Sequence, residues 1–256
     1  MFKPQPFIFA FLTLFELTFL FSVKGCSQPL FVKQNSVFTP SPNFSFLSTK
    51  QIDYFLEVAM GSEFSQSNSV VRKWQGDIKV QVIGTPTPED ITTLVQVMNE
   101  VNFLAEGNIN LRFDNQNSHI KIYFVPEREF ANYESNYQPV NYGFFWTYWN
   151  NNQVITKANI LITTENVTQR ERSHLIREEL TQSLGLMRDS YRYDNSIFYQ
   201  GWTDVNEYSP IDKVLIQTLY RPQIKPGMSQ EQVRQVLRSL IPPQNPQQPL
   251  THPLRN

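Results

Sequence analysis

The sequence predicts an α+β domain, and three observations lead to this prediction. The chain has 256 residues, enough for one domain with a sizeable buried core. Segments with helical spacing of apolar residues come first, alternating strand segments fill the middle, and helical segments return at the end. The sequence shows no internal repeat and no boundary to a second domain. Helices on either side of a block of strands favour a mixed sheet packed against helices.

The first 25 residues are typical of an export signal. Lys3 gives a positive start, and residues 7–23 form an apolar run with few polar interruptions. Cys26, the only cysteine, follows in Val-Lys-Gly-Cys-Ser, which resembles the bacterial lipobox, whose cysteine receives a lipid. Lys24 departs from that pattern, so a chance cysteine beside an ordinary cleavage site remains the alternative. We expect an exported cell-envelope lipoprotein, anchored to the membrane through Cys26 and tethered by residues 26–48.

The first elements of the expected domain are two helices with a strand between them. Ser48 or Thr49 can cap a helix whose apolar residues recur at helical spacing. Residues 78–82 then alternate like a half-buried strand. Thr87 begins the second helix, because a capping hydroxyl, a proline in the first turn and acidic residues near the positive helix end occur together. Gly107 ends that helix.

Strands fill the middle of the chain and helices close it. Alternation predicts strands over residues 109–113, 120–125, 142–149 and 154–163. Thr168 and Glu171 form a capping box for a long helix that reaches Leu186. Two more helical segments follow, over residues 211–220 and 229–240. We therefore expect a folded domain over residues 49–241 and a disordered Pro- and Gln-rich tail over residues 242–256.

The long helix carries the most informative motif of the chain. Residues 178–186 read Glu-Glu-Leu-Thr-Gln-Ser-Leu-Gly-Leu, which resembles the zincin metallopeptidase signature H-E-L-x-H-x-L-G-L with both histidines replaced. Glu178 and Gln182 stand in the places of the two histidines, and Glu179 keeps the place of the general base. In H-E-x-x-H the spacing puts both ligands on one helix face, and the glutamate polarises the metal-bound water.

The residues after this helix extend the resemblance. Gly185 stands where metzincin-type chains bend away from the helix, and Arg188 or Asp189 lies where their third ligand belongs. Residues 196–198, Ser-Ile-Phe, resemble the turn beneath the metal, with Phe198 in the methionine place. The combination is similar to an uncharacterised bacterial family of exported, zincin-like proteins of unknown function. The resemblance implies a zincin-like single domain whose mixed sheet packs against the signature helix, and it does not imply proteolysis.

Helical geometry separates the residues of this helix onto different faces. One face is apolar and is expected to pack on the sheet, through Ile176, Leu180 and Leu184. His174, Glu178 and Gln182 lie together on another face. A metal site needs donors that converge, and these converge. A polar face that is simply solvated remains the alternative.

The replaced ligands change which metal the site would hold. Glu178, Gln182 and Asp189 offer only oxygen atoms, which suit Ca²⁺, Mg²⁺ or Mn²⁺ better than Zn²⁺. A divalent metal, with Zn²⁺, Ca²⁺ and Mn²⁺ all left open, is therefore the cofactor to consider at these three residues. His174 is an alternative ligand that would supply one nitrogen. In the remaining alternative no metal binds, and Arg177, Arg188 or Arg192 hold Glu178 and Glu179. Gln182 would then form a hydrogen bond across the cleft.

An aromatic segment precedes the signature helix. In zincins the edge strand before that helix lines the substrate cleft, so the resemblance implies a substrate-binding role for Tyr142, Phe145 and Trp146. Such rings could accompany an extended peptide that adds to the strand, or stack on a sugar of an envelope polymer. Ordinary filling of the core and of an edge strand is the alternative, because aromatic residues favour strands.

Composition and motifs narrow the function classes. The net charge is −1 and the chain has no basic tract, so nucleic acid is not an expected partner. The chain has no G-x-S-x-G, and its only cysteine lies at the export signal, which disfavours serine and cysteine hydrolases. Two functions remain. One is an atypical or inactive metallopeptidase-like domain, with Glu179 as general base if it is active. The other is a non-catalytic module that binds a peptide or an envelope polymer.

Overall fold

Residues 47–60, 70–139 and 141–240 are described in a computed structural model of the chain. All of them belong to one unit that spans residues 45–256. The predicted export signal, residues 26–46 of the predicted tether, the tail over residues 242–256 and Cys26 lie outside the described residues. Among the residues described, no helix has both the length and the apolar character needed to cross a membrane.

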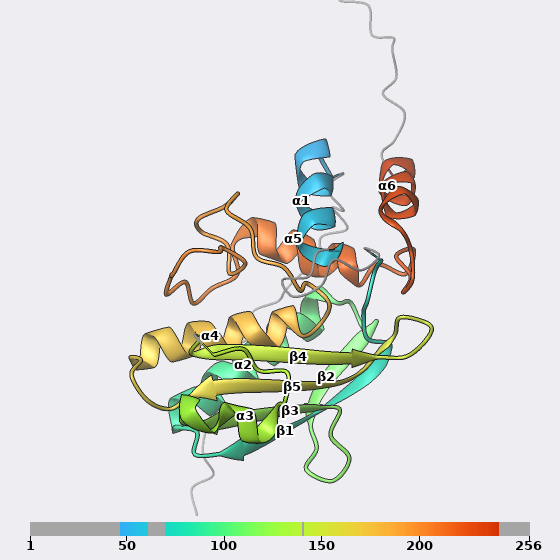
Figure 1. Cartoon of the computed structure of the whole chain (residues 1–256). Coiled ribbons are helices and arrows are strands. Elements are labelled where there is room, and N and C mark those ends of the chain that lie inside the picture. The colour runs from blue at the N-terminus through green and yellow to red at the C-terminus, as the bar shows by residue number, and fades with distance from the viewer. Residues whose placement is uncertain (1–46, 61–69, 140, 241–256) are drawn as a thin grey trace, which may run out of the picture. The chain divides into compact units, whose positions relative to one another are not determined.

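A five-stranded mixed sheet forms the centre of the fold (Figure 1). Its strands are β1 (Gly76–Gly84), β2 (Ile109–Phe113), β3 (Ile120–Val125), β4 (Gly143–Trp149) and β5 (Ile155–Thr163). The order is β2-β1-β3-β5-β4, in which β4 alone runs antiparallel to its neighbour. The predicted strands and the predicted mixed sheet are therefore confirmed, and β4 is an edge strand.

The described residues form six α-helices, and most of them begin after a capping side chain. They are α1 (Thr49–Met60), α2 (Pro88–Leu104), α3 (Phe130–Tyr133), α4 (Gln169–Gln182), α5 (Pro210–Leu219) and α6 (Gln230–Ser239). Thr87, Thr168, Ser209 and Ser229 each form a complete capping box. The short turn at Glu127–Glu129 and α3 after it were not predicted.

The signature helix α4 is shorter than the sequence predicts, and this is a correction. It ends at Gln182 rather than at Leu186, and Gly185 follows with a φ of 119°. A side chain at Gly185 would also collide with the backbone carbonyl of Arg72. Glycine therefore allows both the left-handed backbone and the close approach that turn the chain away from the helix.

Helix α4 lies against the sheet with α2 beside it (Figure 1). Its apolar face is buried as predicted, with Ile176, Leu180 and Leu184 almost wholly inaccessible. Buried Asp90 on α2 accepts hydrogen bonds from Arg172 Nε (2.8 Å) and Gln169 Nε2 (2.7 Å) of α4. These bonds join the two helices, so they fix how α4 lies along the sheet.

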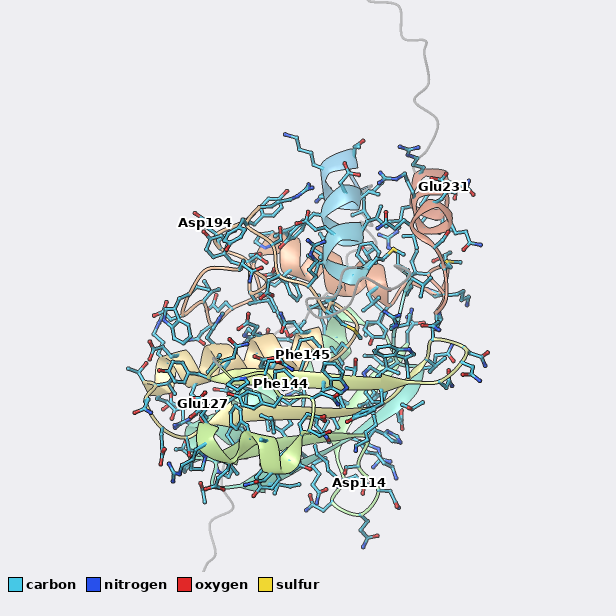
Figure 2. The ribbon with its side chains drawn as sticks, viewed as in Figure 1. Asp114, Glu127, Phe144, Phe145, Asp194 and Glu231 are labelled. Atoms are coloured by element: carbon cyan, nitrogen blue, oxygen red, sulfur yellow. The ribbon has the colours of Figure 1, made fainter. Side chains whose placement is uncertain are left out.

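Successive residues of β4 belong to two different cores, as the alternation of a strand requires. Phe145 packs against the main core, which includes the apolar face of α4. Phe144 packs instead with Tyr123, Phe130 and Leu161 in a second, smaller core. Figure 2 shows both phenylalanines on β4. Phe145 and the residues two positions away from it along β4 therefore face α4, and the residues between them face the second core.

Candidate functional site

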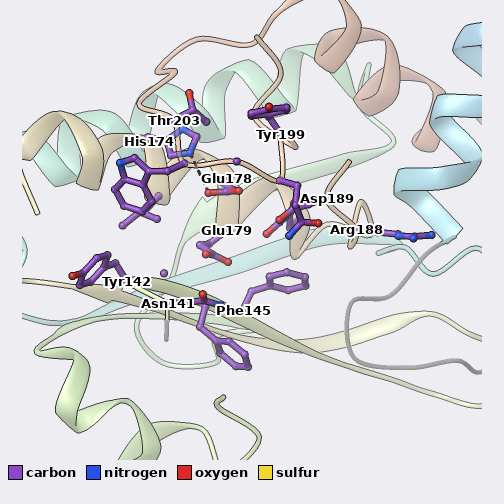
Figure 3. Close-up of a pocket in the computed structure, with 17 residues that line it drawn as sticks. Asn141, Tyr142, Phe145, His174, Glu178, Glu179, Arg188, Asp189, Tyr199 and Thr203 are labelled. Carbon is purple, nitrogen blue, oxygen red and sulfur yellow. Dashed lines mark hydrogen bonds and ion pairs between the residues drawn. The ribbon is translucent and has the colours of Figure 1, made fainter. Parts of the chain in front are cut away.

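A cavity of about 610 Å³ lies between β4, α4 and the segment that follows α4 (Figure 3). Residues 141–145 form one wall. Helix α4 contributes polar side chains, namely those of His174, Glu178, Glu179 and Gln182. The third part comes from residues 188–189 and 199–203. The structure therefore brings together Tyr142, Phe145, Glu178, Glu179, Gln182 and Asp189, which are six of the predicted site residues.

Strand β4 offers hydrogen-bonding groups at the edge of the sheet. Thr163 donates its backbone N–H to the carbonyl of Tyr142 (2.9 Å), so Tyr142 directs its backbone groups toward β5. Alternate residues of an antiparallel pair point the opposite way. The N–H and C=O groups of Phe145 therefore face outward, along an edge that pairs with no other strand of the described chain.

Glu179 lies close to β4 because Gly143 has no side chain. A Cβ atom on Gly143 would overlap Glu179 Oε1 and would lie 3.0 Å from Leu175 Cδ2. The Glu179 side chain is only 7% exposed, yet it lines the cavity. The residue in the place of the general base is thus directed at the site, beside the first residue of the edge strand.

His174 joins Glu178 to the segment after the helix. Its Nε2 lies 3.2 Å from Glu178 Oε2, and its Nδ1 lies 2.7 Å from the carbonyl oxygen of Val205. Both neighbours are hydrogen-bond acceptors, so the ring satisfies both only when each nitrogen carries a proton. Burial alone would lower the pKa of His174, but Glu178 and the Val205 carbonyl outweigh it and raise that pKa.

Gln182 and Asp189 are also paired with each other. Gln182 Nε2 donates to Asp189 Oδ1 at 2.5 Å. The turn at Gly185 reverses the chain, which brings Asp189 back to the helix it has just left. Two of the three predicted metal ligands therefore form a hydrogen bond in which the amide group of Gln182 is the donor.

Two of the arginines considered as partners of Glu178 and Glu179 form ion pairs with other acids. Arg177 pairs with Glu100 of α2 at 2.6 Å, and Arg192 pairs with Glu57 of α1 at 2.6 Å. Arg188 is exposed and directs its guanidinium away from Glu178 and toward α1 (Figure 3). Glu178 is therefore paired with His174, and Asp189 accepts a hydrogen bond from Gln182.

The donor set as arranged does not fit a metal ion. No three His, Cys, Asp or Glu side chains of the described chain gather as metal ligands do. The carboxylate of Glu178 is engaged by His174, and Gln182 presents an N–H rather than a carbonyl oxygen to Asp189. We therefore derive no step through a metal. The assignment of Glu178, Gln182 and Asp189 as ligands stays a prediction.

Residues 199–206, which we call the strap, were not predicted as part of the site. The strap is tied to α4 by His174, by an ion pair between Arg170 and Asp204 (2.5 Å) and by Asn206 Nδ2, which donates to the Arg170 carbonyl (3.2 Å). Its Trp202 lines the cavity and is 61% exposed. The sequence signal that could have indicated this wall was a tryptophan within a polar segment.

Trp146 does not line the cavity, and its predicted substrate-binding role stays a prediction. It packs against the second core and stacks on Phe144, with ring centroids 6.3 Å apart. Strand alternation places Trp146 on the opposite face from Phe145, so one face of β4 cannot present both. Tyr142 reaches the cavity from the end of the strand, where its ring meets Trp202.

These features define an α+β domain in which a metallopeptidase-like signature without its histidines faces a cleft beside an edge strand. The chain belongs to the family described as "Protein of unknown function (DUF2927)", whose model matches residues 48–239. No curated protein matches the chain.

Two solved structures of myroilysin are similar to the chain. "Structure of Myroilysin" matches with 15% identity and a TM-score of 0.38, over 59% of this chain and 82% of that one. "Crystal structure of myroilysin" matches with 14% identity and a TM-score of 0.38, over 68% of this chain and 96% of that one.

Proposed function

We propose that the domain is a metallopeptidase-like scaffold that binds an extended peptide in the cleft between β4 and α4 without hydrolysing it. The observation that carries this proposal is the position of β4. An antiparallel edge strand with outward backbone groups forms one wall of a cavity of about 610 Å³. A peptide that adds to such an edge gains main-chain hydrogen bonds, and its side chains enter the neighbouring pockets.

The hydrogen bonds at the former ligand positions support binding rather than catalysis. Metallopeptidase chemistry needs a metal-bound water, which the glutamate of the signature polarises. In this chain Glu178 is engaged by His174, and Gln182 is engaged by Asp189. Glu179 keeps its place beside β4, but the paired residues around it do not supply an activated water.

A peptide-display selection on the full chain tests strand addition. Phe145→Pro removes the outward N–H of Phe145, whereas Phe145→Ala removes only the side chain and serves as the matched control. We expect selected peptides to bind the proline variant at least tenfold more weakly than the alanine variant. Circular dichroism and thermal unfolding establish that both variants are folded. Equal affinity for the two variants would contradict strand addition.

Glu179→Gln separates binding from catalysis. The substitution keeps the shape of the side chain and removes its ability to act as a base. We expect the selected peptides to stay intact with the wild-type chain, as followed by mass spectrometry, and to bind the variant with unchanged affinity. Cleavage by the wild type that disappears in Glu179→Gln would instead establish an atypical peptidase.

We also propose that the protein is exported and attached to the cell envelope by a lipid on Cys26. The apolar run over residues 7–23 and the lipobox-like residues around Cys26 support this location. Palmitate labelling in a bacterial host provides the test, and we expect Cys26→Ser to abolish the label. Labelling that survives this substitution would rule out the lipid anchor.

A further inference from the structure

Two aromatic rings meet at the cavity from its opposite walls. Tyr142 comes from the β4 side and Trp202 from the strap, and their centroids are 5.9 Å apart at an interplanar angle of 74°. The strap that carries Trp202 is tied to α4 by the ion pair between Asp204 and Arg170. Trp202 nevertheless remains 61% exposed. The two rings thus form a notch that is held in place before any ligand binds.

Several other aromatic rings of this chain already form cation–π contacts with a lysine or arginine of the chain. The guanidinium of Arg72 lies 4.1 Å from the centroid of Trp149, and Lys157 Nζ lies 5.0 Å from that of Tyr148. Arg177 lies 4.4 Å from Tyr208 in the same way. No lysine or arginine of the described chain lies over Trp202. Its ring is therefore accessible to a cation from outside the chain.

The cationic groups at the cavity are not directed at this notch. Arg188, the only lysine or arginine in the cavity wall, points toward α1 and away from the carboxylates (Figure 3). The imidazole of His174 is engaged on both sides, by Glu178 and by Val205. The acidic side chains of Glu178 and Glu179 on α4 also line the cavity. A positively charged group at the notch would thus meet aromatic faces and a negative surrounding.

We propose that Trp202 and Tyr142 form the subsite for a basic side chain, lysine or arginine, of the bound ligand. The inference that this side chain belongs to a peptide rests on the proposed function, but the subsite itself does not. The apolar stem of the side chain packs on the rings, and its charged head lies over the indole face. Trp202 thereby determines which residue of an extended chain is accepted beside β4.

Small probes test the subsite without any strand addition. The full chain labelled with ¹⁵N gives indole N–H resonances from its 4 tryptophans, and Trp202→Phe identifies the one from Trp202. We expect N-acetylarginine amide to shift this resonance saturably, whereas N-acetylnorleucine amide, with a similar apolar stem and no charge, leaves it in place. Equal shifts with both probes, or a shift with neither, would overturn the proposal.

Trp149 provides an internal control, because its ring is exposed but already forms a cation–π contact with Arg72. Its resonance, identified with Trp149→Phe, is expected to stay in place during the same titration. Equal movement of both tryptophans would mean non-specific binding and would also overturn the proposal.

A second comparison separates this proposal from the proposed function. The arginine-amide shift does not require the edge of β4, so it is expected in the wild-type chain whether or not any peptide binds there. If a peptide is bound as proposed, Trp202→Ala weakens a lysine-containing peptide about fivefold and its norleucine counterpart much less. Equal peptide affinity of Phe145→Pro and Phe145→Ala, with the probe shift present in the wild type, would reject strand addition alone. Equal weakening of both peptides would reject the subsite alone.

Discussion

Gly143 decides how closely the acidic residues of α4 approach the edge strand. Its position in β4 faces Glu179 and Leu175, and the space that a side chain would take is already filled by theirs. Glycine is unfavourable in the interior of a strand, and it commonly marks a close approach of another group. In the sequence this glycine is only an interruption among aromatic residues. The structure shows that it leaves room for the side chains of Glu179 and Leu175.

Gly143→Ala is expected to displace the Glu179 carboxylate. The clashing atom is the end of a side chain that can turn away, so the free energy of unfolding falls by only about 1–2 kcal/mol. Peptide affinity is expected to fall about tenfold, because the displaced carboxylate enters the cavity. Denaturant unfolding and peptide titration of the same variant measure the two effects.

Gly107→Ala is the matched control for this prediction. Gly107 has a φ of 79° and no atom within 4 Å of an added Cβ, so alanine there introduces backbone strain without a clash. A similar loss of stability, about 1 kcal/mol, is expected with unchanged peptide affinity. If both variants lost affinity equally, the effect at Gly143 would not come from the cavity.

At the scale of elements, the hydrogen bonds of Asp90 connect α2 to α4, the helix that carries the site. Asp90 is fully buried and accepts from the backbone N–H of Thr87 as well as from Gln169 and Arg172. Burial would raise the pKa of Asp90, but these hydrogen bonds outweigh it and hold that pKa below its usual range. The carboxylate is therefore ionised in the folded protein and joins the N-terminal halves of both helices.

Asp90→Asn is expected to lower the free energy of unfolding at pH 7 by about 3 kcal/mol, since it leaves the buried guanidinium of Arg172 without its charged partner. Because the folded-state pKa is depressed, the stabilisation is fully present above the ordinary pKa near 4 and is lost as the pH falls through the lower folded-state value. Urea unfolding at pH 7 and pH 3 should thus show a smaller difference between wild type and variant at pH 3. An equal difference at both values would show that the carboxylate charge is not responsible.

At the scale of the whole domain, the cleft exists because the chain returns twice to the same place. Residues 141–145, helix α4 and the strap are separate in sequence, and each supplies one part of the cavity. The strap is fastened to α4 through Arg170, His174 and the backbone around Val205. This fastening holds Trp202 opposite Tyr142, so the cleft is formed before a ligand arrives.

The hydrogen bonds of the former ligand residues predict that the fold does not depend on a metal. Calorimetric titration of the metal-stripped full chain with Zn²⁺, Ca²⁺ and Mn²⁺ is expected to show no saturable binding, and chelators are expected to leave the melting temperature unchanged. Glu178→Ala is the control, because it removes the carboxylate that stands in the place of the first signature histidine. Saturable binding that disappears in this variant would show that the site holds a metal in an arrangement different from the one described here.

Much of the fold follows from local patterns in the sequence. The alternation of strands, the helical stripes and the capping boxes depend on residues two to four positions apart, and the structure confirms them. The convergence of His174, Glu178 and Gln182 at one cavity follows from helix geometry in the same way. The early end of α4 was missed, because the close approach of Gly185 to Arg72 is a tertiary contact.

The sequence by itself determined the elements, the mixed sheet and the polar face of the signature helix, because spacing along the chain specifies which side chains share a face. Only the tertiary structure decided that Trp146 faces away from the cavity, that His174 is held by Val205 and that Trp202 meets Tyr142. The contact between His174 and Val205, for example, joins residues 31 positions apart. Such contacts depend on the path of the chain between elements, and local spacing carries no information about that path.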